Sequence, residues 1–399
     1  MVDRPLRVLS VAHTAVSREA GRLRYHPLAA RPDLDVHLVV PERWYQFGRW
    51  QEADPGPEPG VTLHVEPIRL PRFGWAKWYL HTYPGLARLM DRLRPDVLHL
   101  WEEPWSFVAW QAVRLQKRFP NMKIVLEVDQ NINKNLPPPF GWLRRYVLAR
   151  TALVLSRSEE ATAVVRAHGY RDTVHPIGYG VDQSLFRPVP SPNQLVPWPL
   201  RLGYVGRIVV EKGLDDALEA MALTPGVVLS IMGEGPHLPA LTARIRQLGL
   251  ECRVTVRGWG KPAEVASFMQ GLDALILLTR SSASVREQFG RVITEAQACG
   301  VPVIGSTSGA IPDVIGAGGW VVPERDPAAL AQLLAALSGH PAECQARGEA
   351  GIDNVKRRFT YAAVARHLAD AWHAAARRPV TAPIYIPAND PHSAVREIG

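Results

Sequence analysis

The sequence predicts an α/β protein made of two doubly wound, parallel sheets. Short apolar runs typical of buried strands alternate with helical patterns, and this alternation lapses once and then resumes. The chain of 399 residues is too long for one ordinary core, because single cores stop growing near about 250–300 residues. A hydrophobic content of 47% and a charged content of 21% are typical of a folded globular protein.

The two predicted domains are separated by a proline-rich segment, residues 186–200, in which the periodicity lapses. We predict a first domain over residues 1–190, a second over 191–370, and a helix end with an extended tail over 371–399. Ligands of doubly wound sheets bind beyond the carboxyl ends of the strands, so two such domains facing each other would enclose a cleft.

The net charge of +8 is concentrated in the first half of the chain. Residues 1–195 hold 26 Lys and Arg against 19 Asp and Glu, whereas the remainder holds 20 against 19. No zinc finger, RNP-like motif or basic recognition helix is found, so we expect no nucleic-acid partner. An anionic membrane surface or a phosphorylated acceptor fits the basic half better. No apolar run is long enough to span a membrane and no signal-cleavage pattern is found, which predicts a cytoplasmic protein with the option of membrane association.

Neither the cysteines nor the one D-x-D pattern predicts a metal site. Cys252, Cys299 and Cys344 are widely spaced, which favours packing residues over a disulfide framework or a metal cage. Asp33 and Asp35 come just before a predicted strand, and we interpret them as part of a turn.

A helix is predicted in REQFGRVITEAQACGVPVIG, residues 286–305, where apolar residues recur at helical spacing and Gly300 ends the pattern. The recurring residues are Phe289, Val292, Ile293, Ala296 and Cys299. Glu287 lies just before this helix and Glu295 within it. Eight helical steps span roughly 12 Å, which is comparable with a sugar-diphosphate-ribose ligand. The amides of Gln288, Phe289 and Gly290 would be unpaired donors suited to an anion.

Two loops of the second half provide groups suited to a diphosphate. In GYVGRIVVEKGLDDALEAM a strand ends at Gly206, and the loop that follows carries Arg207 and Lys212. Arginine offers bidentate donors and lysine a compact charge. In IMGEGP, Gly233 and Gly235 follow another strand and would let backbone amides approach a phosphate, although a lone G-x-G is weak evidence.

The stretches GRIVVEKG, GEGP and EQFGRVITEAQACGVPVIGSTSGAIPDVI resemble the retaining GT-B glycosyltransferases of family GT4. The resemblance covers nearly the whole chain and is most specific over residues 203–326. It implies two Rossmann-like domains facing a central cleft. It also implies transfer of a hexosyl group from a UDP-, GDP- or ADP-sugar to a glycan, lipid-linked or small-molecule acceptor, with neither a metal nor another cofactor.

The resemblance also implies a role for each site residue. Arg207 and Lys212 would bind the donor diphosphate and stabilise the departing nucleotide, and Glu287 would bind hydroxyls of the transferred sugar. The amides of Phe289 and Gly290 would help to hold sugar or phosphate, and Glu295 would bind the ribose. The complete predicted set comprises the catalytic residues Arg207, Lys212 and Glu287 and the donor-binding residues Gly206, Gly233, Gln288, Phe289, Gly290 and Glu295. Trp259, at another strand end, would flank the base.

The first half departs from the family pattern at two places. The glycine-rich loop after the first strand is replaced by VAHTAVSREAGRLR, which contains only Gly21, and Trp101 occupies the position of a cleft histidine. We expect His99, two residues earlier, to be buried in the sheet. The candidates for acceptor or cleft contacts are Glu102, Glu103, Glu127 and Asn131, with solvated loop polarity as the alternative.

Aromatic and basic residues mix in three segments of the first half, residues 43–50, 69–83 and 140–150. Rings beside cations fit a peripheral membrane contact and a lipid-linked acceptor, whereas packing within their own domain is the alternative. Other functions remain open at this stage. They are a phosphorylase, hydrolase or epimerase on the same fold, or a non-catalytic nucleotide-sugar-binding protein.

Overall fold

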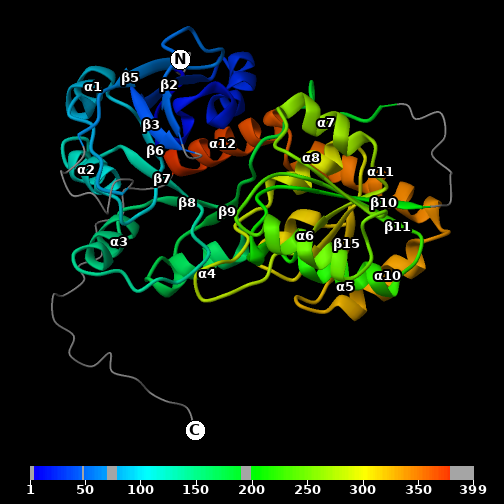
Figure 1. Cartoon of the computed structure of the whole chain (residues 1–399). Coiled ribbons are helices and arrows are strands. Elements are labelled where there is room, and N and C mark those ends of the chain that lie inside the picture. The colour runs from blue at the N-terminus through cyan, green and yellow to red at the C-terminus, as the bar shows by residue number, and fades with distance from the viewer. Residues whose placement is uncertain (1–3, 47–48, 70–78, 190–198, 378–399) are drawn as a thin grey trace.

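The computed structural model describes residues 4–46, 49–69, 79–189 and 199–377, which form two α/β domains (Figure 1). Each domain is organised around one parallel sheet, as the alternating pattern predicts. Most of the proline-rich segment between the domains, and the predicted tail from residue 378, lie outside the described residues.

The first sheet has seven parallel strands in the order β5-β2-β1-β6-β7-β8-β9. Their bounds are β1 Leu6–Val11, β2 Leu34–Pro41, β5 Thr62–Glu66, β6 Val97–Trp101, β7 Lys123–Val128, β8 Leu153–Ser156 and β9 Val174–Pro176. The chain order reverses between β1 and β6, which opens a crevice beyond their carboxyl ends. A separate antiparallel hairpin pairs β3, Arg43–Gln46, with β4, Arg49–Glu52.

Short turns of helix follow β1, whereas α-helices connect the later strands of this sheet. The turns are η1 His13–Val16, η2 Arg18–Arg22 and η3 Leu23–Ala30; the helices are α1 Leu86–Leu93, α2 Phe107–Gln116, α3 Phe140–Leu148 and α4 Glu159–Ala167. Ser106 and Ser158 cap α2 and α4, and each side chain accepts a hydrogen bond from the amide three residues later.

The second sheet has six parallel strands in the order β12-β11-β10-β13-β14-β15. Their bounds are β10 Leu200–Val205, β11 Val227–Met232, β12 Val254–Arg257, β13 Ala274–Leu277, β14 Val303–Ser306 and β15 Gly319–Val322. The helical elements are η4 Val210–Lys212, α5 Leu214–Leu223, α6 Leu238–Gln247, α7 Pro262–Gln270, α8 Arg291–Ala298, α9 Ile311–Ile315, α10 Pro327–Leu337 and α11 Pro341–Arg358. The chain order reverses here between β10 and β13.

The last described helix, α12 (Tyr361–Ala376), returns to the first domain (Figure 1). Its apolar face, which includes Val364, Leu368 and Trp372, is buried in the core formed on one face of the first sheet. The predicted second domain runs to residue 370, so its end does not match this packing. The reason is that periodicity identifies an amphipathic helix without indicating which sheet covers its apolar face.

The structure also shows where the D-x-D pattern and the three cysteines lie, which the sequence assigns to no metal site. Asp33 lies in the turn before β2, as expected, and is paired with Arg31 at 2.8 Å. Asp35 lies within β2, so its assignment to the turn was wrong. Cys299 and Cys344 are buried, but Cys252 is exposed, so its interpretation as a packing residue was wrong. In the described part of the chain, every helix is too short or too polar to cross a membrane.

Candidate functional site

The loop after β10 places Lys212 at the point where the strand order of the second sheet reverses. Gly213 follows with φ of 67°, and a Cβ atom there would lie 2.2 Å from the carbonyl oxygen of Leu278. Glycine is therefore needed for the loop to pack against the end of β13. Arg280 strengthens this contact by binding the buried carboxylate of Asp216 on α5 at 2.7 and 2.8 Å.

Glu287 faces Lys212 across this loop. Its Oε2 atom lies 2.5 Å from Nζ of Lys212 and accepts a hydrogen bond from the hydroxyl of Thr279 at 2.9 Å. The side chains of Lys212 and Glu287 are 25% and 15% exposed, so both charges are partly shielded from water but remain accessible. The structure thus brings together two of the three predicted catalytic residues.

The turn after β14 holds the backbone of Glu287 in place. The amide of Ala310 donates to the carbonyl oxygen of Glu287 at 3.0 Å. Gly309 adopts φ of 56°, and a Cβ atom there would lie 2.1 Å from the same oxygen. Thr279 and this turn were missed as functional residues, because a single threonine or serine-glycine pair has no distinctive spacing.

Arg207, the third predicted catalytic residue, is exposed on the same loop. No described residue binds its guanidinium group, although the hydroxyl of Tyr204 donates to its carbonyl oxygen at 2.7 Å. Burial raises the pKa of Tyr204 well above its usual value, with the charge of Glu287 adding to the rise and that of Arg207 opposing it. Arg207 is therefore close enough to share the field of Glu287, and its charge is available to a ligand.

The predicted phosphate loop after β11 packs closely against the loop after β10. A Cβ atom on Gly233 would lie 1.9 Å from the carbonyl oxygen of Gly206, and one on Gly235 would lie 2.2 Å from that of Ile208. The amide of Ile208 also donates to the carbonyl of Glu234 at 2.8 Å. The glycines are needed for this contact between loops, and approach to a phosphate remains a prediction.

The sequence predicts a helix directly after Glu287, but α8 begins at Arg291, because Gly290 adopts φ of 77°. No side chain caps this end of the helix. Phe289 is instead buried, with ring centroids 5.1 Å from Tyr179 and 5.4 Å from Phe359. This packing fixes the backbone at the helix start, where unpaired amides favour an anion.

Glu295 lies one turn after Arg291 on α8 and is partly buried. Burial raises the pKa of its carboxyl group, and the charge of Arg291 opposes the rise. No described residue forms a hydrogen bond with this carboxylate, so it can accept bonds from a ligand. Its assignment to ribose hydroxyls remains a prediction.

A hollow of about 580 Å³ lies beyond the carboxyl ends of β11 and β12. Met232, Phe268 and Trp259 line it, and Trp259 is 67% exposed. An exposed aromatic ring beside a hollow at this edge of the sheet is suited to stack against a nucleobase.

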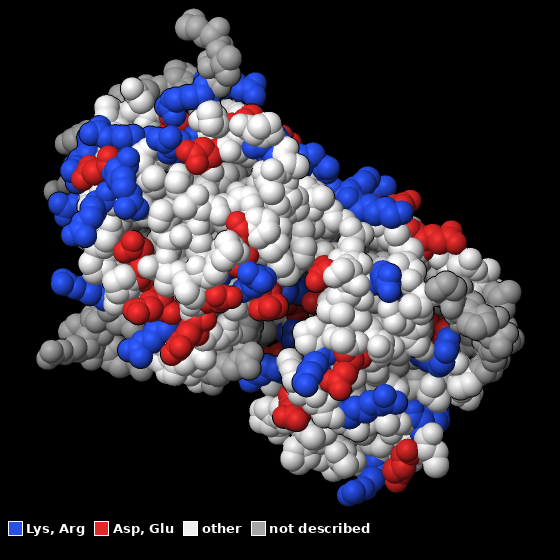
Figure 2. Space-filling view, turned by 90° about the horizontal axis from the view of Figure 1, so that it is seen from above, with Lys and Arg blue, Asp and Glu red and all other residues white. Residues whose placement is uncertain are grey.

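The first domain contributes a cavity of about 280 Å³ at its own carboxyl edge. Residues after β1, β6 and β7 line it, and Gln288 joins them from the second domain. The lining residues are His13, Thr14, Trp101, Glu102, Glu103, Trp105, Glu127, Asp129, Gln130, Lys134 and Gln288. The cavity therefore lies between the domains, beside Glu287, and Figure 2 shows a recess between them bordered by charges of both signs.

Glu102 and Glu103, two of the acceptor candidates, have opposite electrostatic environments. Burial disfavours the charged form of Glu102, but the interactions with His13 and His81 are stronger than this effect. They lower the pKa of Glu102 to about 2. Burial raises the pKa of Glu103 to about 8, with a contribution from the charge of Asp129. Oε1 of Glu103 accepts from the amides of Asp129 and Gln130 at 3.1 and 3.0 Å, while Oε2 has no partner among the described residues.

Glu127 and Asn131 have structural partners, and their assignment as acceptor or cleft contacts remains a prediction. Glu127 binds Arg24 at 2.7 and 3.0 Å and also binds Arg157 and His99, so both of its oxygens are engaged. Burial alone would raise the pKa of Glu127. The charges of Arg157 and Arg24 outweigh this effect and hold the pKa far below its usual value. His99 is fully buried, as expected.

Asn131 joins the two domains. Its Nδ2 group donates to the carbonyl oxygen of Glu287 at 2.9 Å and to Glu160 at 3.1 Å. Arg286 reinforces the same contact by binding Glu160 at 3.1 Å. Glu127 and Asn131 were predicted from their polarity alone. Polarity does not indicate whether a side chain binds another residue of the protein or a ligand.

One group of side chains in the described residues could hold a metal ion. A ring nitrogen of His13, one of His81 and a carboxylate oxygen of Glu102 all lie within 4.8 Å of one another. Nδ1 of His13 is hydrogen-bonded to Glu102 at 2.6 Å. The sequence predicts no metal, and the contact is also that of an ordinary histidine–carboxylate pair.

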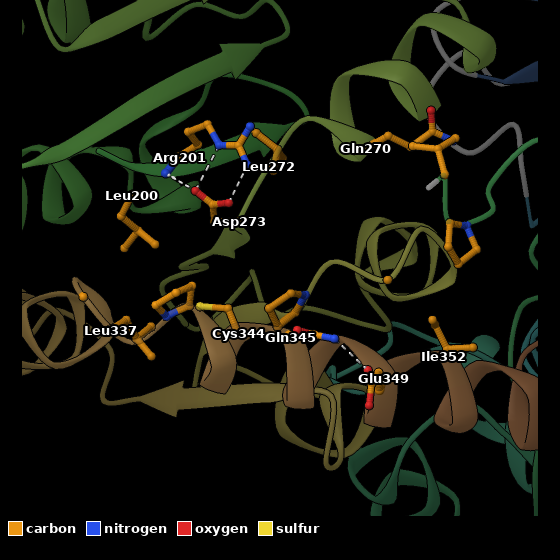
Figure 3. A pocket seen from close by; sticks show the side chains of 16 residues that line it. Leu200, Arg201, Gln270, Leu272, Asp273, Leu337, Cys344, Gln345, Glu349 and Ile352 are labelled. Atoms are coloured by element: carbon orange, nitrogen blue, oxygen red, sulfur yellow. Dashed lines mark hydrogen bonds and ion pairs between the residues drawn. The ribbon is translucent and has the colours of Figure 1, made fainter. Parts of the chain in front are cut away.

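A hollow of about 480 Å³ lies elsewhere on the second domain (Figure 3). It is lined by Leu200 at the start of β10 and by residues of α11, so it is at the opposite end of the sheet from Lys212. Its polar side chains bind one another, as Arg201 does Asp273 and Gln345 does Glu349. We do not assign it to the donor.

Sequence comparisons place both halves of the chain with known proteins. Residues 194–353 match the family described as glycosyl transferases group 1, and residues 28–185 match glycosyltransferase family 4. A D-inositol 3-phosphate glycosyltransferase of Xylanimonas cellulosilytica is 32% identical over 61% of this chain and 62% of its own. Another, from Segniliparus rotundus, is 34% identical over 53% of this chain and 49% of its own. The chain thus spans about half to three fifths of these relatives.

Solved structures show the same architecture at low sequence identity. A sucrose-phosphate synthase of Thermosynechococcus elongatus has a TM-score of 0.66 at 19% identity, covering 92% of this chain and 98% of its own. The Anabaena protein HepE, solved with UDP and glucose, has a TM-score of 0.62 at 16% identity, covering 92% and 100%.

Two facing Rossmann-like domains, with the charged site at the strand ends between them, define the GT-B class of glycosyltransferase folds. Within that class the chain belongs to family GT4, whose models match both of its domains.

Proposed function

We propose that this protein is a retaining glycosyltransferase that moves a hexosyl group from a nucleotide sugar to an acceptor hydroxyl without a metal ion. The observation that carries the proposal is the ion pair between Lys212 and Glu287, held at 2.5 Å at the reversal point of the second sheet, with the free cation Arg207 on the same loop. The relatives named above support glycosyl transfer, and the neighbour solved with UDP and glucose supports a nucleotide-sugar donor.

The two cations would stabilise the leaving group. When the bond between the sugar C1 and the phosphate oxygen breaks, negative charge develops on the diphosphate. Fixed positive charges aimed at that position lower the barrier without reorganising during the reaction. Arg207 and Lys212 supply the positive charge that a divalent cation provides in other enzymes. A bound diphosphate would compete with Glu287 for Lys212 and free the Glu287 carboxylate for sugar hydroxyls.

The order of groups along the edge of the second sheet fits an extended donor. The hollow beside Trp259 follows β12, the stacked glycine loops follow β11 and β10, and Glu287 lies beyond β13. We assign the base to the hollow, the diphosphate to the cations, and the sugar to Glu287 beside the cavity of the first domain. Glu295 would bind the ribose from α8.

The acceptor is proposed to be a glycan or a lipid-linked sugar, with peripheral contact between the first domain and a membrane. Three aromatic side chains of this domain are more than half exposed, Tyr45 and Trp50 on the β3–β4 hairpin and Trp142 on α3. Arg43 lies 5.4 Å from the ring centroid of Trp50. Rings beside cations are typical of the headgroup region. Arg72 and Lys77, part of the predicted basic segment, lie outside the described residues.

A screen of thermal stabilisation tests the donor half of the proposal. UDP, GDP, ADP and their glucose, mannose and N-acetylglucosamine derivatives would be added in turn. A ligand at 100 times its Kd stabilises the folded state by about 2.7 kcal/mol. We expect one base to dominate. Nucleotide release that requires an acceptor would identify a transferase, release without one a hydrolase, and binding without any turnover a sensor.

A further inference from the structure

The cavity between the domains lies where the order of the first sheet reverses. His13 lies two residues after the end of β1 and Glu102 directly follows β6, the two strands on either side of the reversal. Such a reversal point leaves a crevice in which doubly wound sheets bind ligands. The reversal point of the second sheet carries Lys212 and Arg207. Charged residues at the reversal points of both sheets therefore face the same cleft between the domains.

His13 is held by Glu102 in two ways. The backbone amide of His13 donates to Oε1 at 3.1 Å, and its Nδ1 atom lies 2.6 Å from Oε2. Glu102 is 3% exposed, and its Oε1 is also 3.6 Å from Nε2 of His81. An ionised carboxylate only accepts hydrogen bonds, so the proton of a neutral His13 ring is on Nδ1. This tautomer leaves a lone pair on Nε2.

The other ring nitrogen of His13 is available to a ligand. Among the described residues, Nε2 of His13 has no hydrogen-bond partner, and the side chain lines the cavity with 15% of its surface exposed. Trp44 and His81 pack against the ring with centroids 4.6 and 5.3 Å away. The imidazole is thus oriented by a buried carboxylate and wedged by two rings, an arrangement suited to a fixed base.

We propose that His13 is a catalytic residue that accepts the proton of the acceptor hydroxyl, and that Glu102 is a positioning residue that acts through it. The inference rests on the proposed glycosyl transfer. The hydroxyl proton goes to Nε2 of His13 while the acceptor oxygen bonds to C1 on the face from which the diphosphate departs, as retention of configuration requires. The electron pair of the breaking C1–oxygen bond goes to the diphosphate. The imidazolium then releases its proton to the departing diphosphate or to water.

This assignment explains two departures of the sequence from its family. The resemblance implies a cleft histidine at the position of Trp101 and a glycine-rich loop after the first strand, where this chain has VAHTAVSREAGRLR. In the structure, the loop after β1 supplies a histidine, and the position after Trp101 supplies the carboxylate that orients it. In this chain the cleft histidine is therefore His13, which follows β1, and not the residue at the position of Trp101.

The test compares His13→Gln with His26→Gln. His26 is a matched control, since its Nε2 lies 2.7 Å from Glu58, another histidine–carboxylate pair of the same domain away from the cavity. The donors are UDP-glucose, GDP-mannose and ADP-glucose. The nucleophiles are myo-inositol, mannose, water and azide. Azide carries no proton, so it reacts without a base.

We expect His13→Gln to lower transfer to hydroxyl nucleophiles by about 10²–10⁴-fold, the usual contribution of a general base. Binding of the nucleoside diphosphate and formation of the glycosyl azide should stay at the wild-type level. Glu102→Gln should cause a smaller loss of the same kind, because the imidazole remains but loses its orientation. His26→Gln should behave like the wild type.

Three results would overturn the inference. The first is a His13→Gln variant that glycosylates hydroxyls at the wild-type rate. The second is one that binds nucleotide normally but does not react with azide. The third is activity that chelators abolish and zinc restores, because His13, His81 and Glu102 would then hold a metal. A wild type that releases no nucleotide from any donor would instead refute the proposed function. A thermal unfolding curve like that of the wild type shows in every case that the variant is folded.

Discussion

Lys212 and Glu287 lie 75 residues apart in the sequence, yet Nζ of one is 2.5 Å from Oε2 of the other. Both are partly shielded, and Thr279 donates to the same carboxylate oxygen at 2.9 Å. The pair keeps each charge compensated while no donor is bound. It therefore prepares a cation for the diphosphate and a carboxylate for the sugar at adjacent positions.

The first prediction concerns the leaving group. Arg207→Ala and Lys212→Ala should each lower kcat/KM by roughly 10²–10³, because each removes a charge aimed at the developing diphosphate anion. Steady-state rates with the donor selected by the thermal screen would measure the loss. Arg201→Ala is the matched control, since Arg201 is on β10, the strand that precedes this loop, but binds Asp273 at the other end of the sheet. Near wild-type turnover in either variant would exclude that residue from the site.

Much of this site could be predicted from the sequence because its residues fall at strand ends. Hydrophobic alternation locates the ends of β10, β11 and β13, and parallel strands bring those ends to one edge. Arg207, Lys212 and Glu287 were identified in this way together with a family resemblance. Thr279 and Gly309 were not, since hydrogen bonds between loops leave no periodic signal.

The first domain was harder to predict for a physical reason. Glu127 looks like a ligand in the sequence, but its partners Arg24 and Arg157 come from distant segments. His13 has no motif around it, and its importance follows only from the contact with Glu102. Pairing of buried charges depends on tertiary contacts, which local sequence does not specify. The packing of α12 against the first sheet is also a tertiary contact that the local sequence does not specify.

The second prediction separates the two glutamates. Glu295→Ala should weaken binding of the free nucleoside diphosphate, because we place its carboxylate at the ribose. Glu287→Ala should spare that binding and lose sugar selectivity and turnover, since we assign only Glu287 to the hexose. Calorimetry with the bare diphosphate on both variants measures the difference. A larger loss in Glu287→Ala would reverse the orientation of the donor.

The third prediction concerns pH and Glu103. Its carboxyl group has a pKa of about 8 in the folded protein, raised from 4.5 by burial. Between these values the Glu103 carboxyl binds more protons in the folded state than in the unfolded state, so its contribution to the free energy of unfolding decreases as pH rises through this range. Glu103→Gln cannot ionise, and its stability should therefore decrease less from about pH 5 to pH 8 than that of the wild type.

Urea denaturation at several pH values would measure this difference. Glu349→Gln is the control, because Glu349 is an exposed residue of α11 that accepts a hydrogen bond from Gln345 at 3.1 Å. Parallel stability curves for Glu103→Gln and the wild type would show that Glu103 is ionised in the folded protein. Its unpartnered Oε2 would then be an acceptor of hydrogen bonds at neutral pH, not a donor.

The last prediction concerns the membrane. Trp50 and Trp142 are 53% and 52% exposed in the basic first domain, and such rings partition into the headgroup region of a bilayer. Each cation near an anionic surface adds about 1 kcal/mol. We expect the wild type to sediment with phosphatidylglycerol liposomes at low salt and to be released at high salt, where charges are screened.

The double variant Trp50→Ala and Trp142→Ala should bind these liposomes more weakly, and so should neutralisation of Arg69, Arg72 and Lys77. Nucleotide binding should be unchanged in both, because the donor site belongs to the other domain. Trp259→Ala is the matched control for binding to liposomes, since Trp259 is 67% exposed but lies in the second domain. A wild type that stays in the supernatant at low salt, where attraction is least screened, would refute the membrane contact. The acceptor would then be sought among water-soluble sugars.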